Sequence, residues 1–211
     1  MHATAPATAP ILVLGTTNAG KLRELSELLA PLGIPCESLA GHAGAVEVEE
    51  TGGSFAENAA LKAVEQARAL GRWVLAEDSG LVVDALGGAP GIYSARFSGA
   101  GATDARNNAL LLERLAGRRG SERAAHYACH ATLADPSGNV VATSTGICSG
   151  QIAESPAGSG GFGYDPLFIV TEYHRTFGDL SPAVKALISH RARALRAIIP
   201  AILRQLLPRP R

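Results

Sequence analysis

The stretch that decides the start of the fold reads Ile11-Leu12-Val13-Leu14-Gly15-Thr16-Thr17-Asn18-Ala19-Gly20-Lys21. Its opening aliphatic residues, followed by a polar turn, predict a short buried strand. Asn18 is a residue type that caps helices, and leucines recur at helical spacing from there to Leu32. With a further strand near residues 36–39, the segment predicts the β-α-β opening of an α/β domain.

The rest of the chain continues this alternation of helical and strand patterns. Ser54 and Glu57 fit a capping box at the start of a helix. A last amphipathic helix is expected to begin near Pro182 and to pass His190, with a kink or break at Pro200. Residues 1–9 are expected to be a disordered tail before one domain over residues 10–207. The other predicted elements are helices over 54–70 and 103–115, strands over 73–76, 127–134, 140–147 and 167–170, and a hairpin turn at 136–139.

Composition and charge exclude several classes of protein. Hydrophobic residues make up 46% of the chain and charged residues 18%, a globular balance. Lys plus Arg and Asp plus Glu both number 19, so no net field attracts nucleic acid polymers or membranes. No apolar run approaches the roughly 20 residues of a membrane span. Cys36, Cys129 and Cys148 show no metal or disulfide spacing, which favours reduced thiols and a cytoplasmic location.

A candidate phosphate loop lies between the first strand and the first helix. Gly15 to Lys21 matches the first seven positions of G-x-x-x-x-G-K, and backbone N–H groups at a helix start bind anions. The eighth position is Leu22, where a P-loop needs Ser or Thr to hold magnesium. The pattern therefore favours phosphate binding and disfavours a P-loop kinase or ATPase. The alternative is a simple helix cap with a lysine facing solvent.

Two adjacent carboxylates follow the strand predicted over residues 73–76. Glu77 and Asp78 should point to opposite faces of an extended strand, so one of them is expected to face a cleft. A strand-end acid and a loop acid could together hold magnesium with waters and phosphates. The alternative is a solvated acidic loop beside a helix cap. The candidate partners for such a site are Glu47, Glu49, Glu50 and Glu57.

Two further segments offer side chains for a nucleobase. Phe162 and Tyr164 lie in a glycine-rich loop, where an aromatic ring can stack on a base. Lys185 and Ser189 are expected to share one helical face, with His190 about 100° further round. Arg191 carries a planar fork of donors suited to a carbonyl or a phosphate. The alternatives are buried rings that fill the core and a solvated basic helix surface.

These motifs, in this order, resemble the inosine/xanthosine triphosphate pyrophosphatase family. The resemblance implies an α/β fold with a mixed twisted sheet, flanking helices and two lobes around a central nucleotide-binding cleft, in a homodimer. It also implies hydrolysis of deaminated or oxidised purine nucleoside triphosphates (ITP, dITP, XTP) to the monophosphate and pyrophosphate. The matching segments are 16–21, 50–59, 77–81, 87–96, 160–166 and 189–191.

The resemblance also implies roles for individual residues. Asp78 would be the catalytic general base and, with Glu50, would bind Mg²⁺. Phe162 would stack on the base, and His190 and Arg191 would read its edge. The residues that the resemblance places against the substrate are Thr16, Thr17, Asn18, Ala19, Gly20, Lys21, Lys62, Ser79, Phe162, Gly163, Tyr164, Asp165, Lys185, His190 and Arg191.

Two other functions fit parts of the same pattern. A P-loop-like phosphotransferase would need an acceptor and would release nucleoside diphosphate. A nucleotide sensor would bind with the lysines, and its acidic pair would be structural. The products formed from inosine triphosphate and magnesium separate the three hypotheses.

Overall fold

The computed structural model describes residues 10–207, so the tail expected over residues 1–9 lies outside the described residues. Its centre is one seven-stranded mixed sheet with the order β2-β1-β3-β4-β5-β6-β7. β1 lies next to the edge strand β2 and pairs in parallel with β2 and β3, whereas every pairing from β3 to β7 is antiparallel. The strands are β1 (Leu12–Leu14), β2 (Cys36–Ser38), β3 (Trp73–Val83), β4 (Ala124–Ala134), β5 (Val140–Ile152), β6 (Phe168–Val170) and β7 (Arg175–Thr176).

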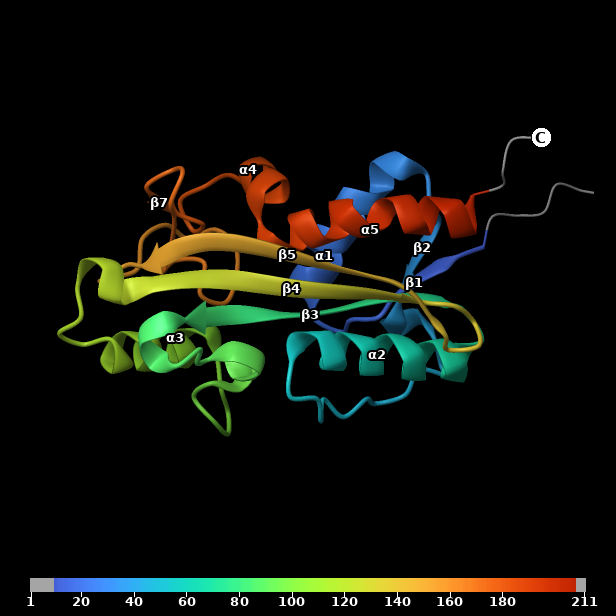
Figure 1. Ribbon diagram of the computed structural model, residues 1–211, viewed down its shortest axis with the longest axis horizontal. Helices are drawn as coiled ribbons and strands as arrows, with labels where there is room; N and C mark the ends of the chain where they lie inside the picture. The colour runs from blue at the N-terminus through green and yellow to red at the C-terminus, as the bar shows by residue number, and fades with distance from the viewer. Residues whose placement is uncertain (1–9, 208–211) are drawn as a thin grey trace, which may run out of the picture.

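Helices cover both faces of the sheet. Figure 1 shows α1, α4 and α5 on one face and α2 and α3 on the other. Helices flanking a mixed twisted sheet are the fold class that the sequence predicts. None of the described helices is long and apolar enough to cross a bilayer. The helices are α1 (Ala19–Leu29), α2 (Phe55–Leu70), α3 (Asp104–Arg114), α4 (Pro182–Ile188) and α5 (His190–Leu206), with short 3₁₀ segments that include η4 (Gly91–Arg96).

The predicted helix starts are confirmed. The side chain of Asn18 accepts a hydrogen bond from the N–H of Lys21 at 3.0 Å and so caps α1. Ser54 does the same for α2, accepting from the N–H of Glu57 at 3.2 Å. The returning bond of the expected capping box is displaced by one residue, because the Glu57 carboxylate accepts from Gly53 rather than from Ser54.

The strand that carries the two carboxylates is longer than its apolar run predicts. The parallel pairing of β3 with β1 ends where Leu75 lies opposite Leu14. The antiparallel pairing with β4 continues to Val83, and this ladder keeps the polar residues extended. Glu77 and Asp78 therefore lie inside a strand, just beyond the carboxyl end of β1, rather than at a strand end.

The prediction of one closing helix that passes His190 is wrong, and no break occurs at Pro200. Pro200 lies inside α5, which continues to Leu206 with its apolar side buried against the sheet. The break falls at Ser189, whose extended backbone (φ −64°, ψ 157°) separates α4 from α5. Ser189 ends α4 by donating its N–H to Lys185 O at 3.0 Å, and its hydroxyl caps α5 at Ala192 N. Ser189 therefore lies outside α4 and His190 begins α5, so the helical face that Lys185 and Ser189 were expected to share, with His190 about 100° further round, does not exist.

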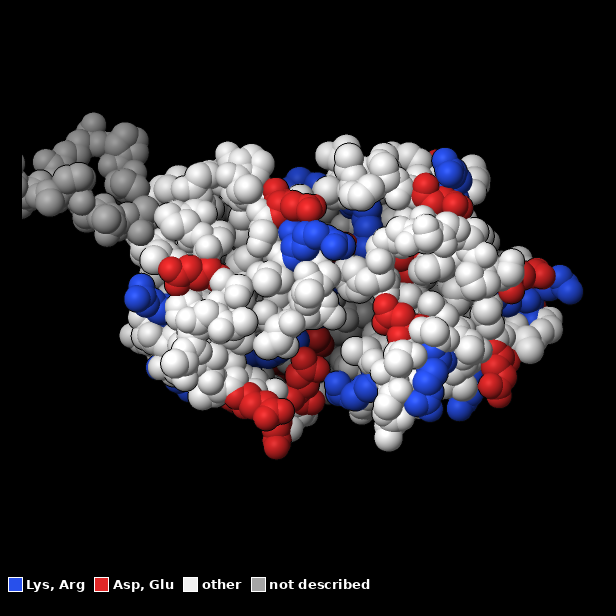
Figure 2. Space-filling view, turned by 180° about the vertical axis from the view of Figure 1, so that it is seen from behind, with Lys and Arg blue, Asp and Glu red and all other residues white. Residues whose placement is uncertain are grey.

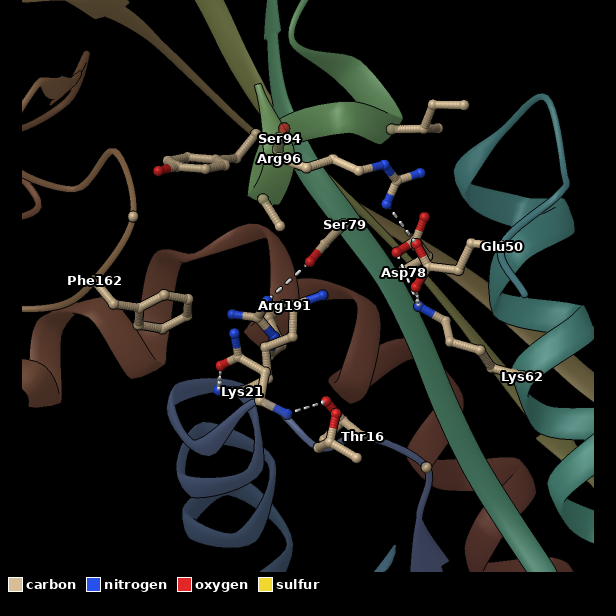
Figure 3. A pocket seen from close by; sticks show the side chains of 18 of the residues that line it. Thr16, Lys21, Glu50, Lys62, Asp78, Ser79, Ser94, Arg96, Phe162 and Arg191 are labelled. Atoms are coloured by element: carbon tan, nitrogen blue, oxygen red, sulfur yellow. Dashed lines mark hydrogen bonds and ion pairs between the residues drawn. The ribbon is translucent and has the colours of Figure 1, made fainter. Parts of the chain in front are cut away.

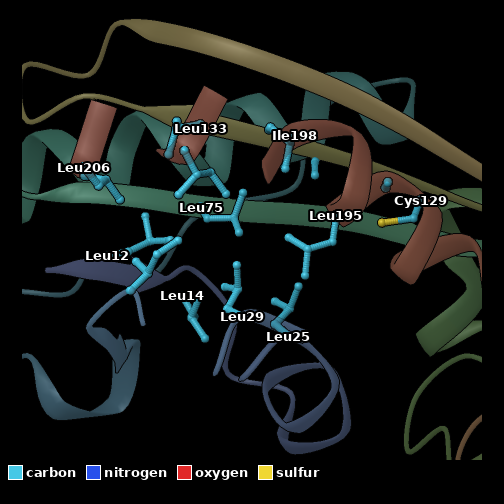
Figure 4. Packing of buried hydrophobic residues seen from close by; sticks show 14 residues of the cluster. Leu12, Leu14, Leu25, Leu29, Leu75, Cys129, Leu133, Leu195, Ile198 and Leu206 are labelled. Carbon is cyan, nitrogen blue, oxygen red and sulfur yellow. The ribbon is translucent and has the colours of Figure 1, made fainter. Parts of the chain in front are cut away.

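The hydrophobic core has two main parts along β3. The first contains Leu75 and packs α1 and α5 against one end of the sheet, as Figure 4 shows. The second contains Leu81 and joins α3 to the other end through residues such as Leu111 and Phe168. Each fully buried leucine contributes about 1.5–3 kcal/mol of hydrophobic stabilisation. The polar residues 77–79 lie between the two parts, so the division of the core places them in a seam.

Gly146 sets how closely α5 approaches the sheet. A Cβ atom at this position of β5 would lie 2.1 Å from the carbonyl oxygen of His190, the first residue of α5. Such a contact is far inside the van der Waals distance, so only glycine permits the observed packing. The backbone of β5 therefore supports the start of α5 directly.

Candidate active site

A cavity of about 420 Å³ lies at the seam between the two parts of the core. The phosphate loop, α2, the middle of β3, η4, the glycine-rich loop and the α4–α5 junction all contribute to its wall. Figure 3 shows side chains from these separate segments pointing toward one another. In Figure 2, acidic and basic side chains alternate around the hollowed middle of the face, in keeping with the balanced charge of the chain.

Most of the predicted site residues line this cavity. Ala19 and Gly20 are the exceptions, and Gly20 instead packs on the ring of Phe162, where a Cβ atom would come within 2.8 Å. Glu47 lines the cavity too, whereas Glu49 and Glu57 do not. The predicted residues in the wall are Thr16, Thr17, Asn18, Lys21, Glu50, Lys62, Asp78, Ser79, Phe162, Gly163, Tyr164, Asp165, Lys185, His190 and Arg191.

The phosphate loop presents a lysine that is held inside the cavity rather than in solvent. The Lys21 side chain is 17% exposed, and its Nζ lies 3.1 Å from Glu77 Oε1. The loop itself is ordered by Thr16, whose hydroxyl accepts from the N–H of Asn18 at 3.2 Å. Asn18 does cap α1, but the alternative in which Lys21 faces solvent is wrong.

Glu77 points away from the cavity, as expected for one member of an adjacent pair. Its carboxylate is fully buried and accepts from Arg191 Nε at 3.2 Å as well as from Lys21. The Cys129 thiol adds a contact of 3.4 Å. Burial alone would raise the pKa of Glu77, but the charges of Arg191 and Lys21 hold that pKa well below its ordinary value of 4.5. Glu77 is thus an anion at neutral pH that fixes the two cations Lys21 and Arg191.

Asp78 faces the cavity on the opposite side of β3. Lys62 of α2 lies 2.9 Å from its Oδ1, and Asn58 lies 3.4 Å from its Oδ2. Burial raises the pKa of Asp78 above its ordinary value of 3.8, because the charges of Lys62 and Lys21 offset only part of the desolvation. Lys62 also contacts Glu50 Oε1 at 2.9 Å, so a single ammonium joins the two predicted metal-binding carboxylates.

The other end of the cavity contains Phe162 with two cations against its ring. Lys185 Nζ lies 4.6 Å from the ring centroid, and the Arg191 guanidinium carbon lies 5.8 Å from it. Lys185 pairs with Asp165 at 2.5 Å and with Glu24 at 2.8 Å, and Glu24 also pairs with Arg191. Glu24 was not among the predicted site residues. Its position three residues after Lys21 places it on the same face of α1, which could have indicated that it lies near the site.

His190 contributes an imidazole with a free ring nitrogen. The ring is buried and stacks on Tyr127, with centroids 4.6 Å apart and planes 8° from parallel. Its Nδ1 is buried without a hydrogen-bond partner within the described residues. Burial, aided by the charge of Arg191, lowers the pKa of His190 well below its ordinary value of 6.5. A neutral ring can accept or donate at this nitrogen, so it is available to a ligand.

Helix α3 fixes the loop that carries Phe162, a role that sequence analysis did not predict. Asp104 Oδ2 accepts from the N–H of Gly163 at 2.6 Å, and Asn108 donates to the Gly163 carbonyl at 3.0 Å. Gly163 has φ +62°, a conformation that favours glycine. Tyr164 extends the network by donating to Ser94 O at 2.8 Å. Helix α3 therefore holds the loop through both the N–H and the carbonyl group of Gly163.

Comparison with known proteins fits this geometry. The sequence profile of the Ham1 family matches residues 12–201. The chain belongs to the Ham1 family. A dITP/XTP pyrophosphatase of Rhodopirellula baltica is 53% identical over 92% of this chain and 93% of its own length. The equivalent protein of Exiguobacterium sp. is 52% identical over 89% of this chain and 94% of its own length.

Solved Ham1 structures have the same fold. A HAM1 protein from Coxiella burnetii superposes with a TM-score of 0.84 at 38% identity, covering 92% of this chain and 99% of that one. A nucleoside-triphosphatase, or dITP/XTP pyrophosphatase, from Mycobacterium abscessus superposes with a TM-score of 0.73 at 40% identity, over 91% and 99% of the two chains. The resemblance inferred from the ordered motifs is confirmed, and so is the fold class it implied.

Proposed function

We propose that this Ham1 chain hydrolyses deaminated or oxidised purine nucleoside triphosphates (ITP, dITP, XTP) to the monophosphate and pyrophosphate. The names of its relatives support this substrate class. The observation that supports the proposal is one cavity whose wall contains Asp78, the lysines Lys21 and Lys62, and the aromatic ring of Phe162. Such an enzyme cleanses the nucleotide pool.

Mg²⁺ is the cofactor that the donor set fits. Glu50 and Asp78 present two carboxylates that a single Lys62 ammonium bridges, so a cation already lies between them. The described residues contain no group of three or more His, Cys, Asp or Glu that could hold a metal alone. That combination suits an ion that takes few carboxylates and completes its shell with waters and phosphates. When bound, Mg²⁺ would polarise the phosphate and neutralise its charge.

Asp78 acts as the general base in this proposal. Its raised pKa favours accepting a proton from the water that attacks the α-phosphorus. Lys21 and the N-terminus of α1 hold phosphate oxygens, with Thr16, Thr17 and Asn18 shaping the loop. Lys62 stays close to the reacting group through its contact with Asp78. The bond broken is the one between the α- and β-phosphates, and pyrophosphate leaves.

Base selection falls to the opposite end of the cavity. Phe162 supplies a face for stacking, and His190 Nδ1 and Arg191 supply edge contacts suited to a 6-oxo group. An adenine places an amino group there and leaves buried donors unpaired, which costs orders of magnitude in rate. Lys185 and Asp165 complete the wall around Phe162, with Ser79, Gly163 and Tyr164.

Two further features belong to the proposal. A cytoplasmic location is supported by the three cysteines, all of which are free. A homodimer is supported by the family resemblance, and exposed apolar side chains such as Tyr93 and Leu187 are available to an interface. Sedimentation of the purified chain measures this assembly directly.

A product assay tests the proposed reaction. The chain is incubated with Mg²⁺ and a panel of ITP, dITP, XTP, GTP and ATP, and pyrophosphate and orthophosphate are quantified separately. We expect pyrophosphate from the first three substrates at rates at least a hundredfold above ATP, and no turnover in EDTA. Nucleoside diphosphate as the product would favour the phosphotransferase, and binding without either product would favour the sensor.

A further inference from the structure

Arg96 is a cation of the cavity wall that the proposed phosphate, metal and base sites do not use. Arg96 comes from the end of η4 and lines the same cavity as Asp78. Its side chain is 47% exposed, so it lies where the cavity meets solvent. The motif that contains it, residues 87–96, carried the family resemblance but was given no function.

Arg96 ends a row of alternating charges. Its Nη1 lies 3.4 Å from Glu50 Oε2, and Glu50 Oε1 lies 2.9 Å from Lys62. Lys62 in turn lies 2.9 Å from Asp78 Oδ1. In Figure 3 this row occupies one side of Ser79, and Phe162 lies on the other side. A triphosphate with its base at Phe162 and its α-phosphorus at Asp78, as proposed, would have its outer phosphates near Lys62 and Arg96.

Arg96 is held more loosely than the other basic side chains in the cavity wall. Lys21, Lys62, Lys185 and Arg191 pair with carboxylates in largely buried contacts. The ion pair of Arg96 with Glu50 is longer and half-exposed, and such pairs contribute little free energy. Releasing this guanidinium to a more highly charged partner therefore costs little.

The ring of Tyr93 supports the Arg96 side chain beside the cavity. The guanidinium carbon lies 5.2 Å from the Tyr93 ring centroid. Tyr93 is 56% exposed, so the ring does not belong to the core. This contact does not involve Glu50, so it does not depend on the ion pair between Arg96 and Glu50.

We infer that Arg96 leaves Glu50 and binds the two outer phosphates of the substrate, which depart as pyrophosphate. Its planar fork of donors matches phosphate oxygens better than a lysine does. The inference rests on the proposed function, since it names the group that receives the leaving pyrophosphate. Glu50, relieved of one cation, then has an oxygen free for a divalent ion.

The test compares pyrophosphate binding with monophosphate binding. The variant Arg96→Met keeps the length of the side chain and removes its charge, at a surface position where folding does not depend on it. Calorimetry with pyrophosphate and Mg²⁺ should show affinity lowered roughly tenfold to a hundredfold, the value of a charge-assisted hydrogen bond. Affinity for inosine monophosphate should stay unchanged. Arg96→Lys should recover part of the loss.

A matched control removes the same charge elsewhere. Arg119 also pairs with a glutamate, Glu154 at 3.0 Å, but it is 75% exposed and outside the cavity. Arg119→Met should bind pyrophosphate as the unmodified chain does. Two variants of Tyr93 test the contribution of its ring. Tyr93→Phe keeps the ring and should keep the pyrophosphate affinity, whereas Tyr93→Leu removes the ring and should reduce that affinity severalfold.

Three outcomes would overturn the inference. These are unchanged pyrophosphate affinity in Arg96→Met, an equal loss for inosine monophosphate, and an equal loss in Arg119→Met. Failure of the proposed function is distinguishable, because the unmodified chain would then release no pyrophosphate from ITP. If the unmodified chain releases pyrophosphate and Arg96→Met binds it normally, only the role of Arg96 is wrong.

Discussion

Glu77 and Asp78 are neighbours on β3, yet the two faces of the sheet give them opposite properties. Glu77 lies under α1 and α5, where Lys21 and Arg191 hold its pKa well below 4.5. Asp78 lies on the α2 side at the cavity, where burial raises its pKa despite Lys62. A shift in opposite directions marks one carboxylate as a fixed charge and the other as a group able to take up a proton.

The difference between Glu77 and Asp78 shows that adjacent residues of one strand can have different roles on its two faces. Alternation along β3 lets Glu77 anchor Lys21 and Arg191 on one face while Asp78 faces the cavity on the other. Ionised Glu77 stabilises the folded chain through its two ion pairs. Ionised Asp78 lowers the stability because burial desolvates its charge. The experiments below should therefore separate activity from stability at adjacent positions.

The largest effect is expected from Asp78→Asn. Removing a general base lowers turnover by about a thousandfold, whereas the affinity for inosine monophosphate should change little. The free energy of unfolding should not fall, because the amide carries no desolvated charge. Steady-state kinetics measures the turnover, and urea unfolding measures the free energy of unfolding. The control is Asp84→Asn, because Asp84 is an exposed acid next to the end of the same strand. Near-normal turnover would remove Asp78 from the role of base.

The complementary change is Glu77→Gln. It leaves Lys21 and Arg191 short of one buried anion, which should cost about 3 kcal/mol in the free energy of unfolding. Turnover should drop less than in Asp78→Asn, because Glu24 still pairs with Arg191. If the Glu77 variant were as stable as the parent chain, the comparison between the two carboxylates would not hold.

The smallest effect is the pH dependence of these stability differences. The depressed pKa of Glu77 contributes stability that is fully present above its ordinary value of 4.5 and is lost as pH falls through the folded value. The difference in the free energy of unfolding between the parent chain and Glu77→Gln should therefore become smaller at acidic pH. For Asp78 the sign is reversed, since its raised pKa makes the ionised form costly above 3.8. Any advantage of Asp78→Asn should thus vanish in acid. Urea titrations between pH 3.5 and pH 7 distinguish these trends.

Local patterns predicted the opening of the fold well, whereas the family resemblance predicted most of the residues that line the cavity. The strand at 11–14, the cap at Asn18 and the ordered motifs depend on neighbours in sequence, so one chain contains the information. The opposite facing of Glu77 and Asp78 follows from strand alternation alone. Nearly all of the residues that the resemblance places against the substrate line the one cavity.

The errors arose where distant contacts override local preference. The ladder with β4 extended β3 past its apolar run, and packing against the sheet kept Pro200 within α5. Arg96 and Asp104 act on loops far away in the sequence, and no spacing rule predicts such partners. Ser189 could have been recognised as a cap, but helical periodicity on both sides concealed it.

Gly146 has a consequence for how base preference could change. The residue lies behind the cavity rather than in its wall, yet it sets the height at which His190 and Arg191 stand above the sheet. Enlarging it to alanine would lift the first turn of α5 and move both side chains together, without altering either one. With His190 and Arg191 reading the base as proposed, Gly146→Ala would alter nucleobase preference from a position outside the cavity wall.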